Sequence, residues 1–277
     1  MGALNAALFL QGNLEKAEEV WLNITPEKIL TVDPLRYLEK VKSRLPNRLF
    51  SSLNSLCTKF IGHGWFSREG LLRIIRQDVN LSIISNSHIH CYATCLHADR
   101  LEVEYFQING YENDHIESIL LASSAIPFIF DPVEINGEMY WDGGVPLPNS
   151  DNIPVRPLYE IGCDLIFVVH LSRENPVEHE HFPNAQIIEI IPQEDQGGFF
   201  DGTLDFTSSG SQRRMKQGYD DAKRILQPIF DMVIVQSKIY ENLISLRKKE
   251  QSFLQQRKTL LNERDKLKQD LCNYLKM

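Results

Sequence analysis

The first residues of the chain constrain its fold most, because they predict a helix that is apolar on almost every side. Residues 3–10 read Ala-Leu-Asn-Ala-Ala-Leu-Phe-Leu, with Asn5 as the one polar residue, and Gly12 follows where a helix C-cap is expected. A helix without a polar face belongs at the centre of a domain, whereas chain ends normally lie at the surface. We therefore expect that a segment which should precede this helix is absent from the chain.

Short apolar segments that predict strands alternate with helical segments, which is typical of the α/β class with a mainly parallel sheet flanked by helices. The continuous apolar runs 164–171 and 185–191 are typical of strands covered on both faces. Residues 88–97 and 101–108 predict an antiparallel pair, and residues 138–141 predict a short strand. Helices are expected over residues 14–22, 35–41, 67–75, 116–125 and 155–161, with breaks at Pro26, Pro34 and residues 62–64.

A long helical extension follows, and we expect two domains, residues 1–225 and residues 226–277. Helical periodicity runs from about Met215 to the C-terminus, with an interruption at Pro228. One seam of this helix is apolar at every seventh residue, whereas the companion seam is charged in its middle. The apolar seam holds Ile239, Leu246, Phe253, Leu260, Leu267 and Tyr274, and the companion seam holds Leu243, Glu250, Arg257, Arg264 and Leu271. The pattern permits a helix folded back on its own domain or a homodimer through a coiled coil.

The charge distribution argues against nucleic acid as a partner. Residues 236–277 hold ten Lys and Arg against five Asp and Glu, whereas residues 1–235 carry a net charge of −13. This net negative charge of residues 1–235 repels the phosphate backbone of a nucleic acid. The basic residues of the tail are mixed with acidic ones, as on a solvated helix face.

Composition excludes several classes of protein. Hydrophobic residues make up 43% and charged residues 24% of the chain, which excludes a disordered, collagenous or membrane-embedded protein. No apolar run approaches the roughly 18 residues that cross a bilayer, so we expect no transmembrane segment. Five irregularly spaced cysteines favour a reducing compartment, and the start of the chain lacks the basic residues of a secretory signal. We expect a cytoplasmic protein.

Asp142 is the candidate catalytic residue. It follows a predicted strand and the aromatic pair Tyr140-Trp141, and it precedes Gly143 and Gly144, which let another group approach the backbone closely. A carboxylate at a strand end beside aromatic surface is suited to act as a general base with a raised pKa. On the local sequence alone, an Asp-Gly turn is the simpler interpretation.

The wider context favours the functional interpretation. Three motifs occur in order, Ala-Ser-Ser-Ala-Ile-Pro at 122–127, Asp-Gly-Gly at 142–144 and Asn-Ile-Pro at 152–154, and a helix and a buried strand follow over 158–169. In this order and spacing they resemble the second half of the patatin-like phospholipase family. Residues 204–206 and 218–222 add to the likeness, which covers about residues 1–225 and implies a three-layer α/β fold.

The resemblance also gives the N-terminal helix a place. In this family the nucleophilic serine lies in a glycine-x-serine-x-glycine elbow, and the residues after it commonly read alanine-x-asparagine-alanine. Residues 1–7, Met-Gly-Ala-Leu-Asn-Ala-Ala, match that run from the residue after the serine, which makes Gly2 the last glycine of the elbow. The sequence contains no glycine-x-serine-x-glycine, so the nucleophile and the oxyanion loop are expected ahead of Met1.

The resemblance implies a lipid acyl hydrolase that uses a serine–aspartate dyad, with no histidine and no cofactor. Asp142 would take the serine proton, Gly143 and Gly144 would form its turn, and backbone N–H groups would hold the oxyanion. A lipid or membrane-surface ester is the expected substrate, and the chain as printed is expected to be inactive. The alternatives are a non-catalytic truncated homologue that interacts through its C-terminal helix, and an unrelated α/β domain with a fortuitous Asp-Gly-Gly.

A segment crowded with metal-ligating residues does not predict a metal site. The segment holds His88, His90, Cys91, Cys95 and His97. On a strand the first two face away from the other three, so four ligands cannot surround one ion, and no metal is expected. Further along, Gly197-Gly198 and Phe199-Phe200 predict either an ordinary loop or an apolar flap that contacts lipid.

Overall fold

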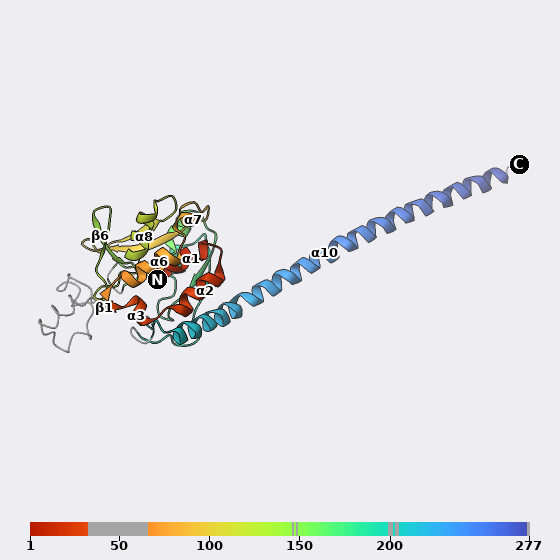
Figure 1. Cartoon of the computed structure of the whole chain (residues 1–277). Helices are drawn as coiled ribbons and strands as arrows, with labels where there is room; N and C mark the ends of the chain where they lie inside the picture. The colour runs from red at the N-terminus through yellow and green to blue at the C-terminus, as the bar shows by residue number, and fades with distance from the viewer. Residues whose placement is uncertain (33–65, 146, 148, 199–201, 203–204, 276–277) are drawn as a thin grey trace, which may run out of the picture. The chain divides into compact units, whose positions relative to one another are not determined.

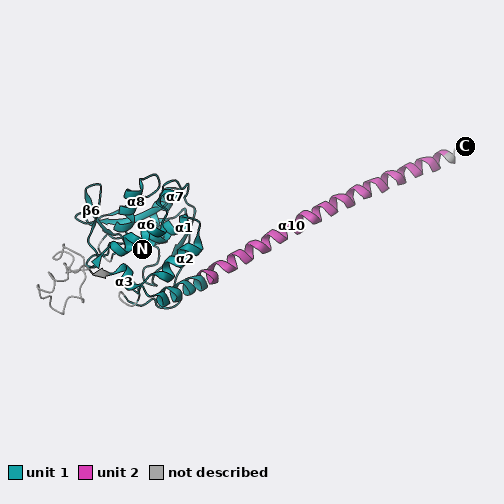
Figure 2. Cartoon of the chain, in the orientation of Figure 1, with its two compact units in different colours: residues 1–221 teal, residues 222–277 magenta. Residues whose placement is uncertain are grey.

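Two units make up the chain, and the computed structural model describes them over residues 1–32, 66–145, 147, 149–198, 202 and 205–275. Unit 1 comprises Met1–Asp221 and unit 2 comprises Ala222–Met277 (Figure 2). The division therefore falls close to residue 225, the predicted end of the α/β domain. Several predicted features lie outside the described residues: the helix over 35–41, the breaks at Pro34 and 62–64, the Phe199-Phe200 flap and Leu204.

Helix α1 (Gly2–Leu10) is the helix that the apolar N-terminal run predicts. Gly12 has a φ of +70° and its N–H donates to the Phe9 carbonyl oxygen at 3.0 Å, so the chain leaves the helix in a conformation that glycine adopts readily. One face of α1 is buried, including Ala7 and Leu8, whereas Phe9 is exposed. The polar Asn5 accepts a hydrogen bond from the Trp21 indole N–H at 2.7 Å.

The remaining helices of unit 1 surround α1 and the main sheet. α1 packs against α2 (Leu14–Asn23), α7 (Leu81–Ser85) and β3 (Tyr92–His97), as Figure 1 shows. The large hydrophobic core draws buried residues from these elements, from α6 (Glu69–Asp78), from α8 (Asn113–Ala122) and, through Ile29, from α3 (Pro26–Ile29). The other short elements are β1 (Thr31–Val32), β2 (Phe66–Ser67), α9 (Arg156–Glu160) and the 3₁₀ helix η1 (His179–His181).

The main sheet has four strands in the order β4-β3-β6-β5, and every neighbouring pair in it is antiparallel. β3 and β4 (Val103–Gln107) form the predicted hairpin, and β5 (Val133–Ile135) forms a second one with β6 (Glu138–Asp142). β3 is an inner strand, and its last five residues are buried. The end of β6, which carries Asp142, therefore lies beside the most buried strand of the sheet.

The α/β class and the long C-terminal helix are confirmed, but the expectation of a mainly parallel sheet is corrected for the described strands. Among these, the parallel arrangement is found at β7 (Leu165–Val169) and β8 (Gln186–Ile190). The strands of the main sheet are instead joined in pairs by short turns, and a short turn can join only antiparallel neighbours.

Strand β7 also differs from its predicted burial. Ile166 and Val168 are buried in a second, smaller core, whereas Leu165, Phe167 and Val169 are 47–69% exposed. One face of this apolar strand is thus uncovered in the described structure. An apolar run predicts that both faces can be buried, but it does not supply the layer that would cover the second face.

Helix α10 (Ser208–Tyr274) has 67 residues, begins in unit 1 and forms the described part of unit 2. The sequence predicts an interruption at Pro228, but the helix continues through it. A proline removes one backbone hydrogen bond and costs about 3 kcal/mol, which bends a long helix more readily than it ends one. All residues from 230 to 273 of α10 are exposed.

Candidate active site

The backbone of Asp142 is fixed between two buried elements. Asp142 lies opposite Cys95 in the β3–β6 register, and its N–H donates to the Ala125 carbonyl oxygen at 3.0 Å. The next N–H, that of Gly143, donates to the Thr94 carbonyl oxygen at 3.3 Å. The strand pairing and the segment after α8 together hold the carboxylate at the end of β6.

The Asp142 carboxylate lies in a poorly hydrated environment. Burial raises its pKa, while the Met1 amino group and the Gly144 N–H oppose that rise. The Gly144 N–H donates to Oδ1 at 2.9 Å. Among the described residues, no hydrogen bond reaches Oδ2, and the side chain is only half-buried. The second oxygen is therefore available to accept a proton from a neighbouring group.

The N-terminal end of α1 lies beside this carboxylate. The Met1 amino group donates to the Ser123 carbonyl oxygen at 3.3 Å, and its charge is close enough to lower the pKa of Asp142. Ser123 and Ala125 belong to the 122–127 motif, so the first residue of the chain, that motif and Asp142 meet in one place. The sequence alone placed these three segments far apart along the chain.

Gly143 and Gly144 stand where a side chain has no room. A Cβ on Gly143 would lie 2.8 Å from the Thr94 carbonyl carbon and 2.9 Å from the Thr94 Cβ. A Cβ on Gly144 would overlap the Asn152 side-chain oxygen. At both positions neighbouring groups lie too close to the backbone for any residue with a Cβ, as the two glycines in the sequence suggest. Gly2 differs, because a Cβ there would meet nothing within 4 Å.

A second carboxylate, which the sequence did not single out, fixes the loop after the two glycines. The Asp151 N–H donates to the Gly143 carbonyl oxygen at 3.0 Å, and the Tyr105 hydroxyl donates to Asp151 Oδ2 at 2.5 Å. Asp151 Oδ1 accepts from the Ile153 N–H at 2.8 Å. Burial and the hydrogen bond to Asp151 raise the pKa of the Tyr105 hydroxyl. Asp151 directly precedes the Asn-Ile-Pro motif, and this position is the sequence signal that could have identified it as a candidate site residue.

The histidines and cysteines of residues 88–97 do not converge. β3 begins at Tyr92, so His88 and His90 precede the strand on which they were predicted to lie. His97 Nδ1 accepts the Asp99 and Arg100 N–H groups, and its Nε2 bonds Glu138 at 3.0 Å, so both ring nitrogens are engaged. Within the described residues, no three His, Cys, Asp or Glu side chains are grouped to hold a metal ion.

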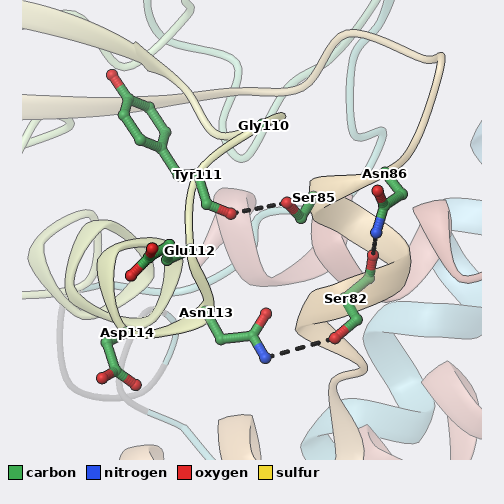
Figure 3. Close-up of a pocket in the computed structure, with 8 residues that line it drawn as sticks. All are labelled: Ser82, Ser85, Asn86, Gly110, Tyr111, Glu112, Asn113 and Asp114. Carbon is green, nitrogen blue, oxygen red and sulfur yellow. Dashed lines mark hydrogen bonds between the residues drawn. The ribbon is translucent and has the colours of Figure 1, made fainter.

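Two clefts stand out on the described surface, and Asp142 lines neither. The first, of about 430 Å³, lies between α7 and the start of α8, and its polar residues bond one another (Figure 3). In it the Ser85 hydroxyl donates to the Tyr111 carbonyl oxygen at 2.7 Å. The second, of about 500 Å³, contains Tyr105, Asp151 and Arg156. Asn149, Ser150 and Asp151 of the loop after the two glycines also line it.

Comparison with known proteins relates the chain to a family. The family model described as patatin-like phospholipase matches residues 1–159, a stretch that includes α1, Asp142 and the Asp151 loop. No curated protein matches the chain. In the described part of the chain, none of the helices combines the length and apolar character needed to cross a membrane.

Proposed function

The chain belongs to the patatin-like phospholipase family, and on that premise we propose that Asp142 is the general base of a serine–aspartate dyad that hydrolyses lipid esters. The family pattern puts the nucleophilic serine directly ahead of Met1, with Gly2 as the last glycine of the elbow. Gly143 and Gly144 form the turn that carries the base. The substrate is a lipid or membrane-surface ester, and the chemistry uses no cofactor.

One observation carries the proposal: the N-terminal end of α1 lies beside Asp142. The Met1 nitrogen donates to the Ser123 carbonyl oxygen at 3.3 Å, and two residues further on the Ala125 carbonyl oxygen accepts the Asp142 N–H at 3.0 Å. A serine joined to that nitrogen starts in the same neighbourhood as the proposed base. The N-terminal end of a helix also favours negative charge, which suits an oxyanion formed there.

The burial of Asp142 supports its role as a base. Because burial raises the pKa of the carboxyl, the ionised form has a stronger affinity for a proton than an exposed carboxylate. Asp142 takes the serine proton while the serine oxygen attacks the ester carbonyl carbon, and backbone N–H groups hold the oxyanion. The leaving alcohol receives that proton. Water, deprotonated by Asp142, then attacks the acyl carbonyl carbon. The bond from that carbon to the serine oxygen breaks, the serine oxygen takes the proton back from Asp142, and the fatty acid leaves.

The experiment adds a glycine-rich segment ending in the elbow serine ahead of Met1 and measures hydrolysis of a short-chain nitrophenyl ester and of phospholipid vesicles. The printed chain should show no turnover above its Asp142→Ala variant, because it lacks the nucleophile. In the extended chain, Asp142→Asn should lower the acylation rate by about 10²–10⁴-fold, because an amide cannot take the serine proton at neutral pH.

A matched control separates the base from a general effect of removing charge. Asp99→Asn makes the same chemical change at an exposed aspartate in the turn between β3 and β4, and it should keep near-full activity. His88→Gln and His90→Gln should also stay within a few-fold of the parent. Near-full activity of Asp142→Asn, or loss of the parent activity on chelation of metal ions, would refute the dyad.

The second candidate function is a non-catalytic interaction through α10. Its support is the set of large apolar side chains that α10 exposes in unit 2, such as Leu246, Phe253 and Leu260. In that case the extended chain stays inactive, whereas substitutions on α10 abolish binding to a partner.

A further inference from the structure

Helix α10 carries an apolar stripe that no described residue of unit 2 covers. The seam residues Ile239, Leu246, Phe253, Leu260 and Leu267 are each 53–68% exposed. Leu243, Leu254, Leu261 and Leu271 lie next to them on the helix and are also exposed. Isolated exposed apolar residues are common, but a stripe of this length along one helix marks an interaction surface.

The charged residues of the companion seam determine which partner fits. Glu250, Arg257 and Arg264 occupy successive core positions of the heptad, between Leu243 and Leu271. In a parallel pair of identical helices, each of these residues faces its own copy, so a glutamate meets a glutamate and two arginines meet two arginines. Like charges that face each other at a core position are destabilising, so the sequence disfavours the parallel arrangement.

An antiparallel arrangement brings opposite charges next to each other without placing them face to face. With the midpoint at residue 255, Glu250 lies between Arg257 and Arg264 of the second copy. The three charged residues then face the apolar side chains of the opposite seam rather than each other. At the two ends of the overlap, Leu243 faces Leu267 and Leu271 faces Ile239. The overlap runs from residue 236 to residue 274, which is about 60 Å of helix.

We infer that α10 pairs with α10 of a second copy of this chain in an antiparallel coiled coil centred near residue 255. Two observations support the second copy as the occupant: the apolar seam is exposed from Ile239 to Leu267, and opposite charges of the companion seam become neighbours only when the second copy is reversed. Arg264 forms an exposed ion pair with the adjacent Asp265, and both Arg264 and Glu250 are exposed. The pairing depends on neither Asp142 nor catalysis.

A lipid surface is the competing occupant, and the same residues argue against it. An amphipathic helix that lies on a membrane keeps its charged residues on the face opposite the apolar one. In α10 the row that contains Glu250, Arg257 and Arg264 lies directly beside the apolar seam, so lipid contact would bury these charges without partners. A coiled coil tolerates charged core positions when opposite charges meet there.

The first experiment measures the mass of the purified full chain by light scattering and its self-association by analytical ultracentrifugation. The parent should have twice the mass of one chain. Glu250→Arg should weaken self-association by about tenfold or more, because it sets three like charges on each helix against those of its partner. The matched control is Glu241→Arg, the same substitution on the outer face of the helix, which should leave the dimer intact. The reversed variant Glu250→Arg, Arg257→Glu, Arg264→Glu restores complementarity and should recover the dimer.

The second experiment reads the orientation from Cys272, which is exposed near the end of α10. In a variant with Cys57→Ser and Cys163→Ser, spin labels on Cys272 report the distance between the two copies, while Cys91 and Cys95 stay protected by burial. The antiparallel register predicts about 50 Å between the labels, whereas a parallel coiled coil brings them within about 15 Å and allows a disulfide.

Each contrary result overturns the inference. A parent chain that remains monomeric at tens of micromolar excludes the pairing. A short Cys272 distance excludes the antiparallel orientation. Equal dimerisation by Glu250→Arg and the parent excludes the charge argument, provided that circular dichroism shows α10 still helical in both. A monomer that sediments with anionic phosphatidylglycerol vesicles assigns the stripe to lipid instead.

Discussion

The replacement Gly143→Ala tests whether the turn beside Asp142 is sterically closed. The added methyl group would lie 2.8 Å from the Thr94 carbonyl carbon and 2.9 Å from the Thr94 Cβ, and it would also overlap Thr94 Cγ2. Overpacking in a buried site costs about 1–3 kcal/mol, and the upper end applies because one of these neighbours is backbone and cannot rotate away. For a unit of this size, about 3 kcal/mol lowers the melting temperature by about 6–12 °C.

Thermal unfolding followed by circular dichroism, with differential scanning fluorimetry as a second probe, measures this shift. Gly2→Ala is the control, because a methyl group there meets nothing within 4 Å and should change the melting temperature by at most about 2 °C. The double variant Gly143→Ala, Thr94→Ser removes the Cγ2 overlap but leaves the backbone contact, so it should recover part of the loss. A Gly143→Ala melting temperature within about 2 °C of the parent would refute the steric reasoning.

Three further predictions concern stability. Leu8→Ala should lower the free energy of unfolding by about 2–5 kcal/mol, because Leu8 is only 1% exposed. Phe9→Ala should lower it by less than about 0.5 kcal/mol, because Phe9 is 64% exposed. Equal losses of the two variants in chemical denaturation would contradict the burial of α1. Asp142→Asn should raise the melting temperature at pH 7, because burial raises the pKa of Asp142 and its charged form therefore opposes folding. This gain in melting temperature should vanish below pH 3.8, where the carboxyl is protonated in the folded and the unfolded chain. A gain that stays constant with pH would contradict the raised pKa. Burial alone would raise the pKa of Glu189, but hydrogen bonds from Val177, His179 and His170 lower it further than burial raises it, so Glu189→Gln should cost about 1.5–3 kcal/mol at neutral pH. That cost should shrink only below pH 4.5, as the pH falls through the folded pKa, and a loss of the cost between pH 7 and 5 would contradict the lowered pKa of Glu189.

Local sequence was sufficient to predict much of the fold, because the relevant signals lie within a few residues. The apolar run and Gly12 predicted α1 and its end, and the break at Asp99-Arg100 predicted the β3–β4 hairpin. The strand that ends at Asp142 was likewise visible from its own residues. Helix caps and tight turns depend on neighbouring residues, so their chemistry can be read directly from the sequence.

The tertiary structure alone decided which segments meet. The apolar pattern of a strand does not identify its neighbours or the layer that covers it, so the sequence could not show that β3, β6 and β5 pair in antiparallel, nor that one face of β7 stays exposed. The position of Met1 beside Asp142 joins residues that are far apart along the chain. Such contacts, and the pKa shift that burial imposes, depend on how distant segments pack. Residue types and local spacing select the candidate base, whereas the folded chain determines its neighbours and its affinity for a proton.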